Sequence, residues 1–168
     1  MREEDWQSVI APRICGHLGI RPECLHAEVK TRDGSRADFV AVTRQRLVVL
    51  ELKMADPGAV LARLGERGIR QLRHYRQSAD EVYVVTLASP RTYEWVDGCL
   101  VVQEPREAQL LPDGVGWMVF DVLSRQLEVM RPASTAGTRE QDRAFLVDQI
   151  VHRLSRASRA VQCCRIAS

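Results

Sequence analysis

The sequence predicts an α/β domain in which helices flank a mixed central β-sheet. Short apolar segments of strand length recur along the chain, and segments with a three- to four-residue apolar period lie among them. Residues 38–53 read as an antiparallel hairpin, whereas the strand–helix–strand order of residues 47–87 predicts a parallel crossover. With 168 residues that are 45% hydrophobic, the chain is long enough for a compact domain with a real core.

The first predicted helix covers residues 4–18. Its apolar residues recur at helical spacing: Trp6, Val9, Ile10 and Ile14. Acidic residues occupy the first turn, where the helix dipole favours them. Pro12 lies inside this segment, so we expect it to kink or divide the helix.

Strand patterns account for most of the next hundred residues. The expected strands are residues 25–31, 38–42, 47–53, 81–87, 100–103, 117–122 and 127–130. Asp33-Gly34 predicts a hairpin turn between the first two strands. The third strand has no polar face in its first four residues, from Leu47 to Leu50, which favours a central position in the sheet.

Three helices are expected after the third strand. Asp56-Pro57 starts the first of them, which runs to about Tyr75 and is weakened at Gly65 and Gly68. Residues 91–95 read as a short helix. An amphipathic helix follows the small-residue linker 132–138, so we divide the chain into residues 1–132, the main domain, and residues 133–168, the linker and C-terminal helix with its basic tail.

Composition excludes several classes of protein. The net charge of +2 does not indicate a nucleic-acid binder by itself. Five cysteines without a Cys-x-x-Cys spacing argue against a disulfide scaffold and against structural zinc. No apolar run approaches the ~20 residues of a membrane span, and no apolar signal-peptide core follows the acidic N-terminus. We therefore expect no membrane association and a cytoplasmic location.

The hairpin of residues 38–53 carries the strongest chemical signal. A turn centred between Arg44 and Gln45 places Asp38 directly opposite Glu51, whereas a three-residue loop would not. Glu51 and Lys53 are two residues apart on a strand, so they share a face. Two opposed carboxylates repel unless a cation lies between them, and Mg²⁺ commonly binds one or two carboxylates together with substrate phosphate. A neighbouring lysine could orient the attacking water or stabilise developing charge.

The Glu-x-Lys tripeptide alone is a weak signal, because Glu28-Val29-Lys30 has the same form on a half-exposed strand. Glu51 and Lys53 instead end an apolar run, where burial of charge without a partner would be costly. A functional pair is favoured over a surface ion pair on that ground, although the surface pair stays open.

These residues resemble the PD-(D/E)XK phosphodiesterase superfamily, which has the restriction-endonuclease-like fold. The order helix, strand, Asp strand, Glu-x-Lys strand, helix, strand matches its core from about Glu3 to Leu87, with Ala37 at the position of the family proline. The resemblance implies a Mg²⁺-dependent endo- or exonuclease acting on DNA, with Mn²⁺ able to substitute. Its metal ligands would be Asp38 and Glu51, and Lys53 would assist the nucleophile.

The resemblance also gives roles to residues outside the hairpin. Gln71 would join the catalytic group and Tyr75 would follow it on the same helix, although Tyr75 could simply pack in the core. Glu4, or Glu3, is the candidate for a further metal ligand. The alternative function is a catalytically inactive module of the same fold that binds nucleic acid or a protein partner. A further alternative is an unrelated α/β interaction protein.

Arginines form two groups. Arg63, Arg67 and Arg70 share a face of the second helix and could contact phosphates with Tyr75 nearby, or could simply be a solvated face. The tail carries further arginines without acids among them: Arg153, Arg156, Arg159 and Arg165. The tail could be a nucleic-acid arm, a homodimer contact or a frayed end.

Overall fold

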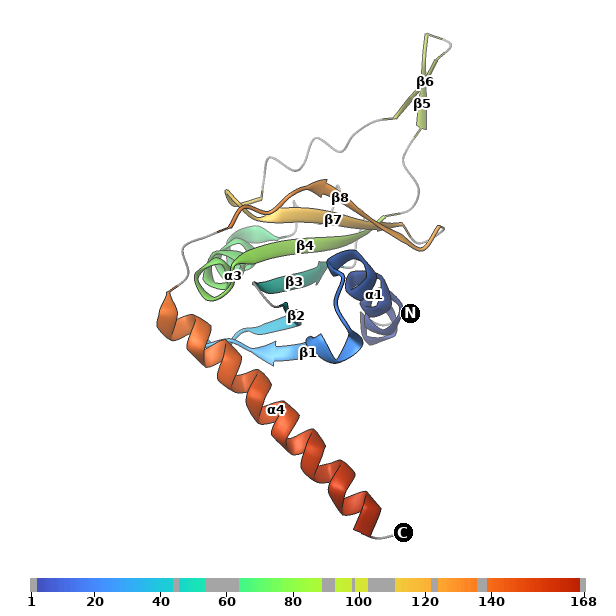
Figure 1. Cartoon of the computed structure of the whole chain (residues 1–168). Helices are drawn as coiled ribbons and strands as arrows, with labels where there is room; N and C mark the ends of the chain where they lie inside the picture. Colours follow the sequence, from blue (N-terminus) through green and yellow to red (C-terminus); the bar gives the residue numbers. More distant parts are fainter. Residues whose placement is uncertain are drawn as a thin grey trace.

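The computed structural model describes residues 3–43, 46–53, 64–88, 93–97, 99–102, 111–121, 124–135 and 139–166 (Figure 1). Six strands form one mixed sheet in the order β1-β2-β3-β4-β7-β8. They are β1 (Leu25–Lys30), β2 (Arg36–Val42), β3 (Leu47–Lys53), β4 (Glu81–Ala88), β7 (Gly116–Asp121) and β8 (Gln126–Arg131). The neighbours β3, β4 and β7 run parallel, and the remaining pairs are antiparallel. The predicted α/β class and mixed central sheet are confirmed.

Three helices flank this sheet in the described part of the chain. They are α1 (Glu3–Leu18), α3 (Gly65–Ser78) and α4 (Glu140–Ile166). A short 3-10 turn, η1 (Pro22–Cys24), connects α1 to β1. A separate two-stranded ribbon, β5 (Tyr93–Val96) with β6 (Cys99–Val102), stands apart from the sheet in Figure 1.

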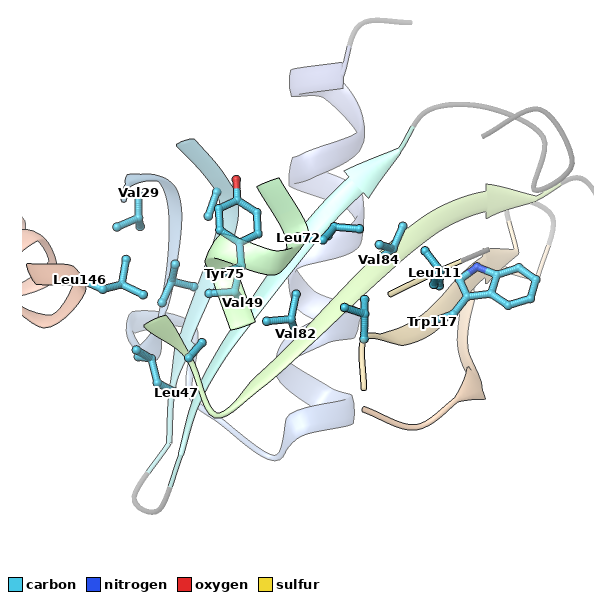
Figure 2. Packing of buried hydrophobic residues seen from close by; sticks show 14 of the residues in the cluster. Val29, Leu47, Val49, Leu72, Tyr75, Val82, Val84, Leu111, Trp117 and Leu146 are labelled. Carbon is cyan, nitrogen blue, oxygen red and sulfur yellow. The ribbon is translucent and has the colours of Figure 1, made fainter. Parts of the chain in front are cut away.

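The alternation of side chains along β3 separates two hydrophobic clusters. Val48, Leu50 and Leu52 belong to a cluster with Ile10 and Ile14 of α1. The alternate positions of β3 face a second cluster, which includes residues from α3 and α4 (Figure 2). Helix α1 therefore covers one face of the sheet, and α3 and α4 cover the other.

The segment that we separated at residue 133 contributes to the second cluster. Leu146 is fully buried and Ile150 is 5% exposed, and both pack in the cluster that contains Val49. Hydrogen bonds at the start of α4 add to this packing, including those from Arg32 to Gln141 and Asp142. The first half of α4 thus shares a core with residues 1–132.

One sequence-based expectation is wrong in part and another is wrong. Pro12 does not divide the first helix, because it lies inside a single helix, α1. Ile10 and Ile14 on either side of it are fully buried, so packing against the sheet outweighs the hydrogen bond that proline cannot donate. The segment predicted as a helix at residues 91–95 contains β5 instead, because Tyr93–Val96 pairs with Cys99–Val102.

The predicted helix start at Asp56-Pro57 lies outside the described residues. Helix α3 begins at Gly65, whose φ of 51° is in the left-handed region. Glycine adopts this conformation at little cost, and a right-handed helix cannot continue through it. Among the described residues, no helix is both long and apolar enough to cross a membrane.

Candidate metal and phosphodiester site

The candidate site begins where β2 and β3 separate. Their antiparallel ladder has the predicted register, with Val42 opposite Leu47, and its last pair is Phe39 with Leu50. Asp38 and Glu51 are the next residues on the two strands. Just after the last pair, the Asp38 side chain connects β2 to β3, because its Oδ2 accepts a hydrogen bond of 2.6 Å from the Leu52 N–H.

Glu51 and Lys53 form an ion pair at the end of β3. Lys53 Nζ lies 2.6 Å from Glu51 Oε1. The Glu51 side chain is 5% exposed and that of Lys53 is 31% exposed, so the lysine connects a buried carboxylate to the solvent side. A simple surface ion pair is excluded by the burial of Glu51.

Helix α3 adds Tyr75 and Gln71 to the same place. The Tyr75 hydroxyl donates a 2.8 Å hydrogen bond to the Arg36 carbonyl and accepts one from Gln71 Nε2. Burial raises the pKa of this hydroxyl, and the negative charges of Glu51 and Asp38 raise the pKa further. Burial and the two negative charges all disfavour the phenolate, so the Tyr75 hydroxyl stays protonated.

The prediction that Tyr75 contacts nucleic acid is wrong. Its side chain is 0% exposed and packs in the cluster shown in Figure 2. Because the ring is in the core and the hydroxyl is bonded to β2, Tyr75 positions the strand that carries Asp38. Gln71 is half-buried beside it.

The remaining candidates are the arginines predicted to contact phosphates and the glutamates predicted as a further metal ligand. Arg67 and Arg70 are exposed on α3, and Arg67 lies one helical turn before Gln71. Arg63 lies outside the described residues. Glu3 and Glu4 are in the first turn of α1, but their side chains are also outside the description. The structure therefore brings together Asp38, Glu51, Lys53, Gln71 and Tyr75.

The donor set suits a hard divalent cation. In the part of the chain that the structure describes, no group of three or more His, Cys, Asp or Glu side chains could hold a metal ion. Asp38 and Glu51 supply two carboxylates from neighbouring strands, and Mg²⁺ commonly takes one or two from a protein and completes its shell with water or phosphate oxygens. The two residues fit such an ion.

Comparisons with known proteins identify the fold only. No protein-family model and no curated protein match the chain. A solved structure of a protein of unknown function from Silicibacter pomeroyi matches with a TM-score of 0.56 and 17% identity. The match covers 91% of this chain and 86% of that chain. The similarity extends over most of both chains and carries no activity with it.

Sequence reasoning missed the groups that hold the site in place. The Leu52 N–H and the Arg36 carbonyl are backbone atoms, which every residue has, so no pattern in the sequence distinguishes them. Thr86 pairs with Lys53 in the β3–β4 ladder and accepts a 2.9 Å hydrogen bond from Trp117 Nε1. The sequence does contain one signal for Thr86, since it is a polar residue within the apolar run of β4.

Proposed function

We propose that the protein is a metal-dependent nuclease of the restriction-endonuclease-like PD-(D/E)XK type, which hydrolyses phosphodiester bonds in DNA. One observation carries the proposal: two buried carboxylates, Asp38 and Glu51, lie on neighbouring strands just after their last pair, and Lys53 forms an ion pair with Glu51. The order of the elements from α1 to β4 and the antiparallel-then-parallel sheet support it, since the same order is expected for that fold.

In this proposal Asp38 and Glu51 hold Mg²⁺, for which Mn²⁺ can substitute. The ion supplies Lewis acidity and lowers the pKa of a bound water. The hydrogen bond from the Leu52 N–H holds the Asp38 carboxylate in one orientation. The side chain would therefore need no further ordering before its second oxygen binds the ion. Tyr75 fixes β2 from the α3 side through the Arg36 carbonyl.

Lys53 serves the attacking water. Its ammonium group touches Glu51 and is about one-third exposed, so it is held on one side and open to substrate on the other. There it can orient the water or donate to phosphoryl oxygens as negative charge develops on them. Gln71 stands on the same side through its contact with Tyr75.

Exposed arginines on α3 provide the phosphate contacts. Arg67 is one turn from Gln71, and Arg70 is adjacent to that residue in sequence. Contacts of this kind recognise the phosphate backbone and not the base sequence, so they fit binding without direct sequence readout.

The test is cleavage of plasmid and oligonucleotide DNA with Mg²⁺ or Mn²⁺, before and after chelation. Lys53→Ala should lower the single-turnover rate by about 10²- to 10⁴-fold, the usual contribution of a proton-transfer group. The matched control is Arg46→Ala, which removes the cation from another buried glutamate, Glu81, at the other end of the sheet. Its rate should stay within a few-fold of the unmodified protein. Activity that is unaffected by Lys53→Ala would eliminate the proposed site.

A non-catalytic module on the same fold is the second candidate. It is favoured only by the exposed arginines of α3, which would bind nucleic acid without the carboxylates. It predicts DNA binding with no cleavage and no Mn²⁺ binding by calorimetry. Glu51→Gln would then leave DNA affinity unchanged.

A further inference from the structure

An apolar stripe on α4 is the most exposed hydrophobic feature in the described part of the chain. Its three residues are Val147, Val151 and Leu154, which are 41%, 54% and 48% exposed. Every other large apolar side chain that is described as exposed is 38% exposed or less. The stripe adjoins the side of α4 that carries Leu146 and Ile150 into the core: Leu154 follows Ile150 by four residues, and Val147 and Val151 lie farther around the helix.

The geometry of α4 leaves this stripe available. The helix has 27 residues, which corresponds to about 40 Å, and Figure 1 shows it extending from the body toward the C-terminus. Arg153 fastens it to β1 by donating hydrogen bonds to the Ala27 and Glu28 carbonyls. The body thus holds one side of the helix while the stripe faces elsewhere.

The spacing of the stripe is that of a coiled-coil seam. Val147, Val151 and Leu154 are separated by four and then three residues, the alternation that keeps one seam facing a partner helix. Positions 144, 158 and 161 continue the alternation with Ala144, Ser158 and Val161 in the sequence. A seam of this length fits another helix of the same kind.

The distribution of charge along α4 favours a second copy of the chain as the partner helix, in the antiparallel direction. The acids of the helix are all in its first half, Glu140, Asp142 and Asp148, and no acid follows Asp148 in the chain. The second half instead carries arginines, including the exposed Arg156. Two copies side by side in parallel would set like charges together, whereas an antiparallel pair sets the acidic half of each copy against the basic half of the other.

We propose that two copies of this chain associate through α4 as an antiparallel helix pair. We align the two antiparallel seams so that Val151 of each copy lies opposite Leu154 of the other. In this alignment position 144 lies opposite position 161. The contact is self-complementary, as a two-fold interface requires. It is independent of the proposed nuclease activity and would stand if that activity were disproved.

The association is tested by sedimentation velocity of the full chain over a range of concentrations. We expect a reversible dimer whose dissociation constant rises at least about 100-fold in Val151→Asp, because the charge would be desolvated in the seam. Leu154→Glu is the second variant and should act in the same way. The matched control is Val9→Asp, since Val9 is an exposed valine on α1, and it should dimerise normally.

Disulfide trapping tests the direction. In a background with Cys163 and Cys164 replaced by serine, a mixture of Ala144→Cys and Val161→Cys chains should form a mixed disulfide dimer on oxidation. Neither variant alone should cross-link. Self-cross-linking of each variant would show a parallel pair and overturn the antiparallel assignment. A chain that stays monomeric at every concentration would overturn the dimer itself, and binding of phosphatidylglycerol vesicles through α4 would then show that the stripe contacts lipid instead.

Discussion

The two ends of β3 are built alike, and one difference distinguishes the end that carries the proposed site. At one end the Asp38 carboxylate accepts a hydrogen bond from the Leu52 N–H, and at the other Asp80 accepts one from the Leu47 N–H, each of 2.6 Å. Each end also has a buried glutamate with a cation: Glu51 with Lys53, and Glu81 with Arg46.

The partners of the aspartates separate the two ends. Asp80 forms an ion pair of 2.6 Å with Arg143 of α4, so each acid at that end has its own arginine. At the Glu51 end, burial raises the pKa of the Tyr75 hydroxyl, and the charges of Glu51 and Asp38 raise the pKa further. A buried acid–base pair is therefore not in itself a functional signal in this protein. The feature that distinguishes the proposed site is the effect of two carboxylates, Glu51 and Asp38, on the same Tyr75 hydroxyl.

Metal binding should show the largest difference between the ends. Glu51→Gln and Asp38→Asn should each weaken Mn²⁺ binding by at least about 10- to 100-fold, since even loss of an outer partner of a metal ligand costs that much. Glu81→Gln and Asp80→Asn should leave it unchanged. Isothermal titration calorimetry on the four variants measures this. Equal effects at the two ends would remove the distinction on which the site is based.

The free energy of unfolding should change more at the Glu81 end than at the Glu51 end, which is the reverse of the order expected for metal binding. Glu81→Gln loses the charge that pairs with Arg46 and should lower the free energy of unfolding by about 1–2 kcal/mol, because the arginine is half-exposed and partly screened. Glu51→Gln also weakens an ion pair, but it relieves repulsion with Asp38, so the change should be within about 1 kcal/mol or stabilising. Urea unfolding of both variants decides the point. A larger loss for Glu51→Gln than for Glu81→Gln would contradict it.

Each end also has a buried tyrosine, which allows a finer comparison. Tyr75→Phe removes the hydrogen bonds to Arg36 and Gln71 and should cost about 1 kcal/mol of unfolding free energy. It should also lower any DNA cleavage rate, because β2 would be less firmly held. Tyr83→Phe is the control near Glu81 and should leave cleavage unaffected. If both variants cleave normally, Tyr75 has only a packing role.

The smallest expected effect is a pH dependence at the Asp80 end. Burial raises the pKa of Asp80, but hydrogen bonds from Arg143 and the Leu47 N–H outweigh it and hold this pKa below the ordinary 3.8. A depressed folded-state pKa contributes stability that is present above 3.8 and is lost as the pH falls through the folded-state value. The destabilisation by Asp80→Asn should therefore shrink below that pH in unfolding measurements. A constant difference down to acid pH would show that the charge of Asp80 does not stabilise the fold.

The sequence determined the six strands of the main sheet, the sheet class and the central position of β3, but it did not predict β5. It also indicated the hairpin register, because a turn centred between Arg44 and Gln45 pairs Val42 with Leu47, as the structure does. That register makes Asp38 and Glu51 the next residues on the two strands after the last pair, Phe39 with Leu50. These features depend on interactions between residues near each other in the chain, which a sequence pattern can represent.

Only the tertiary structure decided the rest. The burial of Tyr75, the continuity of α1 through Pro12 and the second acidic pair, Asp80 and Glu81, depend on contacts between distant segments. The exposed stripe of α4 is visible only once Leu146 and Ile150 are known to be the residues that face the core. In each case the local pattern allows two outcomes, and packing against a partner that is remote in the sequence selects between them.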